Sequence, residues 1–391
     1  MSLPAWCQSA LLVASAATAA AWLVGGFVYY AGMRRIRGLC SVHPLPDAEL
    51  PALSIVSAAR NEAPRIDGAA RSLLAQDYPA LQVIAVDDRS EDGTGAILDG
   101  VAAEDPRLRV LHVTELPEGW LGKCHALDRG VAASSGEWVL FTDGDVSLAP
   151  DAARRAVALA IREGADHVAV SADMEVRGLG EAMFLAYFVF AFNVSERPWE
   201  AKNPRSGAHI GIGAFNLVRR AAYERAGGHR AIRMELLDDM GLGLIVKRSG
   251  GVSMFAAHDG LVRARWQEGL GGLVRGVEKN AFPALRYRVL ATVGAVALQT
   301  ALSLLPVAAL LASDPRTVAA GILAWSGVFL VYSTTSRLVE TRTWHAVTMP
   351  VGALVFAYSI LVSMFLALRR GGIIWRGTFY RLGDLKAGRV R

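Results

Sequence analysis

Four long runs without a charged residue constrain this chain more than any other feature of its sequence. They are 24, 25, 20 and 23 residues long and cover Ala10–Met33, Val289–Ser313, Thr317–Ser336 and Ala346–Leu368. A hydrocarbon core of about 30 Å needs roughly 20 helical residues to span it. A buried core helix seldom stays uncharged over such a length, so we expect one N-terminal and three C-terminal membrane-spanning helices rather than a wholly soluble protein.

Charges beside the first run predict its orientation. Arg34, Arg35 and Arg37 follow it at once. By the positive-inside rule, the middle of the chain then lies on the cytoplasmic side of the cell (inner) membrane. No Lys or Arg precedes the run, which also exceeds the length of a signal-peptide core. The three scattered cysteines form no CxxC pair, which favours a reducing compartment and excludes a cysteine zinc site.

The positive net charge of +5 is a property of the C-terminal tail. Residues 369–391 carry +6, so the rest of the chain sums to −1, which indicates a membrane-surface patch rather than a nucleic-acid groove. With four spans and a cytoplasmic middle, however, this basic tail would lie outside, against the positive-inside rule. One of the last three runs is then re-entrant or interfacial, and Thr317–Ser336 is the first candidate.

Residues 50–285 have the ordinary polarity of a folded soluble domain. Apolar strands alternate with helices, which predicts an α/β fold with a doubly wound, mostly parallel sheet. Ligands of such sheets bind at the carboxyl ends of the strands. The predicted strands are Leu53–Ala59, Leu81–Val86, Leu108–Val113 and Trp138–Thr142, and the predicted helices are Ile66–Gln76, Gly95–Glu104 and Cys124–Ala133.

One apolar segment inside this region has two readings. Met183–Val194 has 12 residues, too few to span a membrane, and is rich in aromatic side chains. It is either a buried helix or a helix that lies in the membrane interface and guides an apolar substrate. On the interfacial reading, Phe184, Phe188 and Phe192 would face the lipid.

Acidic residues gather after the predicted strands. Asp143 and Asp145, separated by one glycine, follow the fourth strand, and such carboxylates can share Mg²⁺ or Mn²⁺ that bridges to substrate phosphates. Asp87–Thr94 holds four acids in eight residues after the second strand. That loop predicts a ligand site, a turn with a helix cap at Asp92 or Thr94, or both.

Three further segments carry candidate functional groups. Arg60-Asn61-Glu62 ends the first strand, and Lys123 enters a helix, where it could hold a diphosphate together with helix-start amides. Asp238-Asp239 begins an apolar helix. A carboxylate there is a helix cap or, beside a bound sugar, a general base.

The order of these motifs resembles inverting glycosyltransferase family 2, with its GT-A nucleotide-sugar-binding fold. The resemblance covers about Leu53–Ala281 and rests on RNE, DDRSEDGT, GWLGKCHAL, DGD, GIGAFNLVRRAAYERAGG, LDD and RW in that order. The flanking apolar runs, the segment Val274–Phe282 and the tail Trp375–Leu382 resemble three membrane-bound branches of the family. These are the hopanoid-associated, the carotenoid-glycosylating and the ceramide-glycosylating branches.

The resemblance implies a role for each matching position. Asp239 would be the catalytic base, with Asp238 beside it, and Asp145 and Asp143 would bind the metal, Mg²⁺ or Mn²⁺. Asp88 would contact the base of the nucleoside. The residues implied to bind the nucleotide sugar are Arg60, Glu62, Asp88, Lys123, Asp143, Arg265 and Trp266.

Two departures from the family pattern affect these expectations. The usual Glu-Asp pair is Asp238-Asp239 here, which leaves open which of the two aspartates is the base. Val262 stands where the Gln of Q-x-x-R-W is expected, which argues against a processive polysaccharide synthase. Arg263 and Arg265 both remain candidates for the diphosphate.

We therefore expect an enzyme that transfers one sugar from a nucleotide sugar to a lipid acceptor at the cytoplasmic membrane face, with inversion. A same-fold alternative makes a polyprenyl-phosphate sugar, and a polysaccharide synthase is a third. A non-catalytic membrane scaffold is a rival of another class, which the joint presence of Asp88, Asp143, Asp145 and Asp239 disfavours.

Overall fold

A computed structural model describes residues 4–390, which divide into two compact units. The sheet unit comprises residues 36–175, 196–265 and 374–390, and the helical unit comprises the remaining described residues up to 373. The expected soluble domain, 50–285, differs from the sheet unit at four points. The sheet unit begins earlier, leaves out 176–195 and 266–285, and takes in the C-terminal tail.

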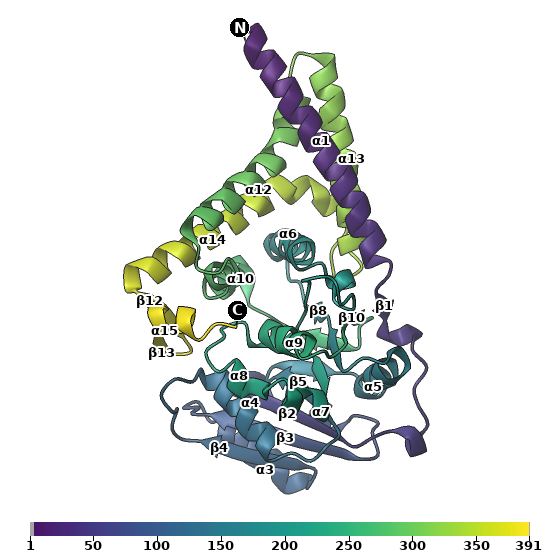
Figure 1. Ribbon diagram of the computed structural model, residues 1–391, viewed down its shortest axis with the longest axis vertical. Coiled ribbons are helices and arrows are strands. Elements are labelled where there is room, and N and C mark those ends of the chain that lie inside the picture. The colour runs from purple at the N-terminus through teal and green to yellow at the C-terminus, as the bar shows by residue number, and fades with distance from the viewer. Residues whose placement is uncertain (1–3, 391) are drawn as a thin grey trace. The chain divides into compact units, whose positions relative to one another are not determined.

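An eight-stranded sheet forms the centre of the sheet unit (Figure 1). Its order is β1-β10-β7-β9-β5-β2-β3-β4, and only β9 runs antiparallel to its neighbours. Three short strands form a second sheet in the order β6-β11-β8, and β12 and β13 form a hairpin. The strands are β1 Arg37–Gly38, β2 Leu53–Ala59, β3 Leu81–Asp88, β4 Leu108–Val113, β5 Trp138–Asp143, β6 Val146–Leu148, β7 His167–Val170, β8 Asp173–Met174, β9 Asn216–Arg219, β10 Ser253–Ala257, β11 Val262–Ala264, β12 Gly372–Trp375 and β13 Thr378–Arg381.

Helices cover both faces of the large sheet, which explains why its central strands are apolar throughout. Successive side chains of a strand point to opposite faces. Ile55 and Val83 belong to one buried cluster and Val56 and Ile84 to another, so neither face of β2 or β3 meets water. The helices of this unit are α2 Ala63–Leu74, α3 Thr94–Glu104, α4 Gly122–Ala132, α5 Ala152–Glu163, α7 Arg220–Arg225, α8 Gly228–Ala231, α9 Asp238–Arg248 and α15 Leu382–Ala387.

The doubly wound, mostly parallel fold is therefore confirmed. β2 and β4 have the predicted bounds, and β3 and β5 extend beyond them to Asp88 and Asp143. The helix predicted over Ile66–Gln76 begins three residues earlier, because Pro64 suits the first turn of a helix.

Four helices of the helical unit are long and apolar enough to cross a membrane, one N-terminal and three C-terminal, as predicted. They lie in or near α1 Ala5–Met33, α12 Val289–Leu310, α13 Pro315–Thr335 and α14 Met349–Arg370. The other helices of this unit are α6 Leu179–Glu196, α10 Gly269–Glu278 and α11 Ala281–Ala284.

Helices α1 and α13 lie side by side along their length (Figure 1). A Cβ added to Gly327 would lie 2.5 Å from the carbonyl oxygen of Trp22, and one added to Gly26 would lie 3.1 Å from the carbonyl oxygen of Gly327. Further along, the Tyr29 hydroxyl lies 3.0 Å from that of Thr335. Contacts advance together along both helices, so α1 and α13 run parallel, and glycines allow their backbones to approach.

The segment Met183–Val194 lies within α6, an 18-residue helix that packs on the other helices of its unit. Phe184 is fully buried and contacts Phe356 of α14 with 6.1 Å between ring centroids. Tyr187 is also buried, and its ring lies 5.7 Å from that of Phe356. The interfacial reading is wrong for these side chains, because packing on α14 covers them.

Gly327→Val tests the close approach of α1 and α13. The added methyl groups would meet the backbone of Trp22, and overpacking of this kind costs about 1–3 kcal/mol. Thermal unfolding of the full chain in detergent should show a lower midpoint. Gly294→Val in α12 is the matched control, because a Cβ there meets no atom within 4 Å. Equal midpoints for the two variants would contradict the packing described.

Candidate active site

The carboxyl ends of β2, β3 and β5 gather the candidate residues of the sheet unit. In the register of the sheet, Ala59 pairs with Asp87 and Ala58 pairs with Asp143. Arg60, Asp88 and Asp143 therefore end three adjacent parallel strands, at the edge where α/β folds bind ligands. The prediction that polar residues collect at this edge is confirmed.

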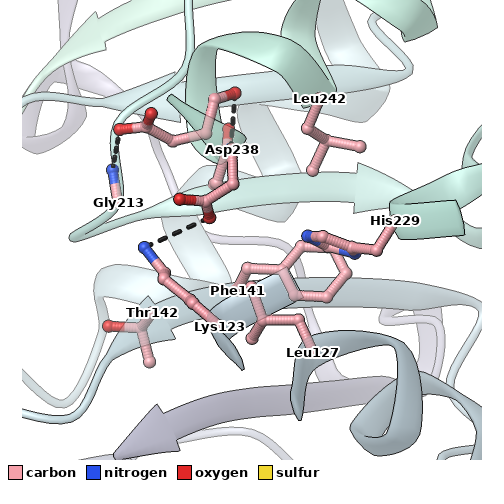
Figure 2. A pocket seen from close by; sticks show the side chains of 10 residues that line it. Lys123, Leu127, Phe141, Thr142, Gly213, His229, Asp238 and Leu242 are labelled. Atoms are coloured by element: carbon pink, nitrogen blue, oxygen red, sulfur yellow. Dashed lines mark hydrogen bonds and ion pairs between the residues drawn. The ribbon is translucent and has the colours of Figure 1, made fainter. Parts of the chain in front are cut away.

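Lys123 is the centre of the site. Its ammonium nitrogen lies 2.8 Å from a carboxylate oxygen of Asp143. It also lies 3.2 Å from a carboxylate oxygen of Asp238 (Figure 2). Burial favours the neutral amine, but the negative charges of Asp143, Asp238 and Asp239 outweigh it and raise the pKa of Lys123. Lys123 is therefore a charged lysine that joins the end of β5 to the start of α9.

Asp239 occupies the first turn of α9, beside this lysine. One of its carboxylate oxygens accepts the backbone N–H of Gly213 at 2.9 Å, and the other accepts that of Met240 at 2.8 Å. Desolvation and the neighbouring Asp238 raise the pKa of Asp239 to about 6, although Lys123 works in the opposite direction. A carboxylate with such a pKa takes up a proton more readily near neutral pH than an ordinary aspartate does.

Glycines allow the loop before β9 to approach these carboxylates. A Cβ on Gly213 would lie 2.6 Å from Asp143, and one on Gly211 would overlap the carbonyl of Asp239. This contact explains the glycines at positions 211 and 213. The loop and Lys123 also line a small pocket, whose residues are Lys123, Leu127, Phe141, Thr142, Gly213, Asn216, His229, Asp238, Asp239 and Leu242 (Figure 2).

Asp145 forms a second cluster one residue beyond Gly144. Burial raises its pKa to about 6, the charges of Asp143 and Glu62 add to that effect, and Arg65 opposes it. The nearest Arg65 nitrogen is 3.7 Å from an Asp145 oxygen. Asp145 is thus a mostly buried carboxylate whose ion pair with Arg65 is long, which suits a group that meets a cation.

The donor set at this position fits a divalent metal that the substrate helps to hold. Within residues 4–390, no three His, Cys, Asp or Glu side chains are grouped as a protein-only metal site. Mg²⁺ is commonly bound by one or two carboxylates with substrate phosphates and water. Asp145 and Asp143 can supply the two carboxylates for Mg²⁺ or Mn²⁺.

The acidic loop Asp87–Thr94 fixes the starts of two helices and also contains a candidate ligand group. Asp92 accepts hydrogen bonds from the Thr94 hydroxyl and from the backbone N–H groups of Ala63 and Thr94. The hydroxyl bond, followed by the two backbone bonds, lowers the pKa of Asp92. These bonds hold the starts of α3 and α2 together. Asp88 instead faces the site and binds the Arg89 guanidinium at 2.8 and 3.0 Å. A helix cap and a candidate ligand group thus lie four residues apart.

The Arg265-Trp266 pair is divided between the two units. Arg265 follows β11, whose residue Ala264 pairs with Val146, so it is close in the fold to Asp145. Its guanidinium donates to the carbonyl of Glu175 at 3.3 Å. Trp266 belongs to the helical unit, where its ring packs on Phe188 at 4.7 Å between centroids.

Two side chains that the sequence did not single out join these clusters. The first is Arg65, which pairs with Asp145 and donates to the carbonyl of Arg265 at 3.2 Å. The second is Arg376 of the tail, which pairs with Glu62 at 2.9 Å. The one local signal for Arg65 is its position one helical turn after Glu62. Nothing local to Arg376 indicates its partner, which is 314 residues away in the chain.

Comparison with known proteins agrees with this geometry. Residues 54–227 match the model of the family "Glycosyl transferase family 2". The succinoglycan biosynthesis protein ExoO of Rhizobium meliloti is 34% identical over 30% of this chain and 32% of its own length. The beta-monoglucosyldiacylglycerol synthase of Synechocystis sp. is 34% identical over 35% of this chain and 30% of its own length.

A longer match and a solved structure extend the similarity. The 4,4'-diaponeurosporenoate glycosyltransferase of Staphylococcus aureus is 25% identical over 59% of this chain and 60% of its own length. A mannosyltransferase of Pyrobaculum calidifontis, solved with GDP-Man and Mn²⁺, has a TM-score of 0.55 at 22% identity and covers 90% of this chain and 99% of that one. The chain thus spans about a third to three fifths of these curated relatives, and the solved structure shares its fold.

Lys123→Met tests the balance of charge at the site. The change leaves Asp143, Asp238 and Asp239 without their shared cation, and loss of one partner from a buried ion pair costs about 3–5 kcal/mol. The folded-state pKa of Asp239 is already raised, so the cost is largest above pH 6, where the carboxylate is ionised, and shrinks as the pH falls toward 5. Thermal unfolding of the full chain between pH 5 and 8 measures this.

Lys202→Met is the matched control, because Lys202 pairs with Glu163 at a more exposed position. Such pairs contribute about 0–1 kcal/mol, so the control should unfold almost like the parent chain at every pH. A Lys123→Met variant as stable as this control at pH 8 would contradict the assigned role of Lys123.

Proposed function

We propose that this chain, whose residues 54–227 match glycosyltransferase family 2, transfers one sugar from a nucleotide-diphosphate sugar to a lipid acceptor at the cytoplasmic face of the inner membrane. The observation that carries the proposal is the arrangement of Asp239 and Lys123. A carboxylate with a raised pKa and a charged ammonium adjoin the strand edge at which the fold binds ligands. A base and an anion-binding cation are the two groups that sugar transfer to a hydroxyl needs.

The mechanism begins with the acceptor hydroxyl. As its oxygen attacks the anomeric carbon, Asp239 takes its proton, and the bond from that carbon to the phosphate oxygen breaks. The electron pair leaves with the nucleoside diphosphate. Attack from the face opposite the leaving group inverts the anomeric centre, and no covalent intermediate with the enzyme forms.

Charge develops on the leaving diphosphate, and the site holds cations to offset it. Lys123 lies between Asp143 and Asp238, and Arg65 lies beside Asp145. A divalent metal held by Asp145 and Asp143 would supply further positive charge to the phosphates when bound. Arg60, Glu62 and Asp88, at the ends of β2 and β3, are the side chains that we assign to the nucleoside, and we assign Arg265 and Trp266 to the closing loop.

Two observations support a lipid acceptor. Four helices have the length and composition of membrane spans, and relatives include proteins named for a glucosyldiacylglycerol and for a carotenoid acid. Val262 in place of the glutamine of processive synthases argues for transfer of a single sugar. An acceptor dissolved in the bilayer would be reached by an enzyme anchored there.

Connectivity supports a specific membrane topology. The chain leaves the sheet unit after Arg265 and returns to it at Ile374. A segment whose two ends meet the same soluble unit crosses a bilayer an even number of times. Of the three candidate helices α12, α13 and α14, at most two therefore cross completely.

Helix packing indicates that α14 is the exception. A Cβ on Gly321 of α13 would lie 3.0 Å from Ala309 near the end of α12, so these helices form an antiparallel hairpin. Because α13 also runs parallel to α1, both end on the same side. We therefore propose that α1, α12 and α13 cross, and that α14, rather than Thr317–Ser336, is re-entrant or interfacial. The basic tail is then cytoplasmic.

Labelling of single cysteines in intact cells tests the topology, in a chain whose Cys7, Cys40 and Cys124 are replaced by alanine. A membrane-impermeant maleimide should label Ser313→Cys directly but Lys386→Cys only after permeabilisation, since both positions are exposed. Glu118→Cys in the sheet unit is the cytoplasmic control. External labelling of Lys386→Cys alone would mean that α14 crosses, and external labelling of Glu118→Cys would reverse the orientation.

Asp239→Asn tests the function itself. Purified full chain is incubated with a panel of nucleotide sugars, Mn²⁺ or Mg²⁺ and a bacterial lipid extract, and the lipid products are identified by mass spectrometry. The variant should bind the donor normally and lose turnover by about 10²- to 10⁴-fold, because the amide keeps the shape of the carboxylate and removes its basicity. In the parent chain, kcat should fall as the pH drops below about 6, because Asp239 becomes protonated, and this fall should be absent from the variant.

Asp67→Asn, an exposed carboxylate of α2 that pairs with Arg71, is the control and should turn over normally. A glycosylated lipid formed equally well by Asp239→Asn would favour a phosphate acceptor, which needs no base. If no nucleotide sugar reacts with any lipid but a soluble acceptor is glycosylated, the lipid assignment fails.

A further inference from the structure

The C-terminal tail folds back onto the nucleoside side of the site. β12 and β13 are joined by the two residues Arg376 and Gly377, whose φ angles are +46° and +79°. Positive φ at both positions is the geometry of a type I′ hairpin turn, which normally selects Asn or Gly at the first. An arginine in this left-handed conformation is strained, so a contact made by its side chain is expected to compensate.

Arg376 makes that contact with the end of β2. Its guanidinium donates to the carbonyl of Arg60 at 2.7 Å and to the carboxylate of Glu62 at 2.9 Å. The Glu62 side chain is mostly buried. Two donors in fixed geometry therefore hold both the backbone and the carboxylate of the segment that we assign to the nucleoside.

Tyr380 of β13 contacts the start of α4. Its hydroxyl accepts the backbone N–H of Gly122 at 3.3 Å, and its side chain is buried. Gly122 has no room for a side chain, because a Cβ there would meet the Asp88 and Arg89 side chains. Tyr380 thus borders the Asp88–Arg89 pair and the residue that precedes Lys123.

The last residues hold the loop that leads into α9. The N–H of Val390 donates to Glu235 at 3.3 Å, and an Arg389 nitrogen lies 4.0 Å from the same carboxylate. A Cβ on Gly388 would touch the side chain of Met234. The tail therefore contacts three segments that carry Glu62, Lys123 and Asp239, although it lies more than 100 residues from each in sequence.

We propose that the β12–β13 hairpin is a wall of the donor site and that Arg376 and Tyr380 are positioning residues for the nucleoside half of the nucleotide sugar. Arg376 acts through Glu62, whose carboxylate it orients, and Tyr380 acts through the start of α4 beside Asp88. The inference rests on the proposed function, because it assumes that a nucleotide binds at this edge. It assigns the tail a part in donor recognition as well as any contact with a membrane surface.

The test is calorimetric binding of UDP, GDP, CDP, ADP and dTDP, each with Mn²⁺, to the full chain in detergent. Arg376→Ala should lower the affinity for the nucleotide that the parent binds best by about tenfold, which is the scale of one charge-assisted hydrogen bond. Arg376→Lys should recover part of the loss, and Tyr380→Phe, which keeps the ring, should weaken binding by about threefold. In turnover assays, KM for the donor should rise while kcat changes less.

Two comparisons separate positioning from a general structural role. Arg381→Ala removes an exposed charge from the same hairpin and should bind like the parent chain. If Arg376 acts through Glu62, then Arg376→Ala combined with Glu62→Gln should bind no more weakly than Glu62→Gln alone. Additive losses, or an equal loss in Arg381→Ala, would overturn the inference.

Two other outcomes are also decisive. Binding by both Arg376→Ala and Tyr380→Phe within twofold of the parent would overturn the hairpin's role and leave the proposed function intact. Tighter binding by Arg376→Ala would mean that the hairpin obstructs the site rather than builds it. If the parent chain binds none of the five nucleotides, the proposed function fails, and the inference fails with it.

Discussion

A single buried ammonium connects the parts of this molecule that chemistry requires to be together. Lys123, at the start of α4, binds Asp143 at the end of β5 and Asp238 at the start of α9. These carboxylates are 95 residues apart in sequence and would repel each other without a cation between them. Burial and the neighbouring Asp238 raise the pKa of Asp239, and Lys123 limits that rise, so the ammonium that stabilises the fold also sets how readily the candidate base takes up a proton.

The sheet could be predicted from sequence, because its central strands are buried on both faces. Such strands have continuous apolar runs, and the run at Leu53–Ala59 gave the bounds of β2 without error. The edge strand β4 also has its predicted bounds, Leu108–Val113, although Arg109 and His112 interrupt its apolar sequence. Strand ends were harder, since Asp88 and Asp143 look like loop residues yet continue the ladder. The segment Met183–Val194 was ambiguous because partners in the fold, such as Phe356, decide whether an aromatic helix is buried.

The candidate site was predictable where a motif lies within a few residues and unpredictable where the partner is distant. Asp143, Asp145, Asp238 and Asp239 were recognisable by spacing and by resemblance, and the structure brings Asp143 and Asp238 to one lysine. Arg376 was counted as one charge of a basic tail and as part of the segment Trp375–Leu382 that resembles membrane-bound branches of the family, without a role of its own. Its two-residue turn between apolar strands was a readable hairpin signal, but the pairing with Glu62 exists only once the chain has folded.

The most direct measurement is a structure of the full chain with a nucleoside diphosphate and Mn²⁺, with the metal located by its anomalous scattering. The account predicts the Mn²⁺ peak at coordinating distance from Asp145, the diphosphate between that metal and Lys123, and the nucleoside against Glu62 and Asp88. A nucleotide bound away from the carboxyl ends of β2, β3 and β5, or a metal peak remote from Asp145, would contradict it.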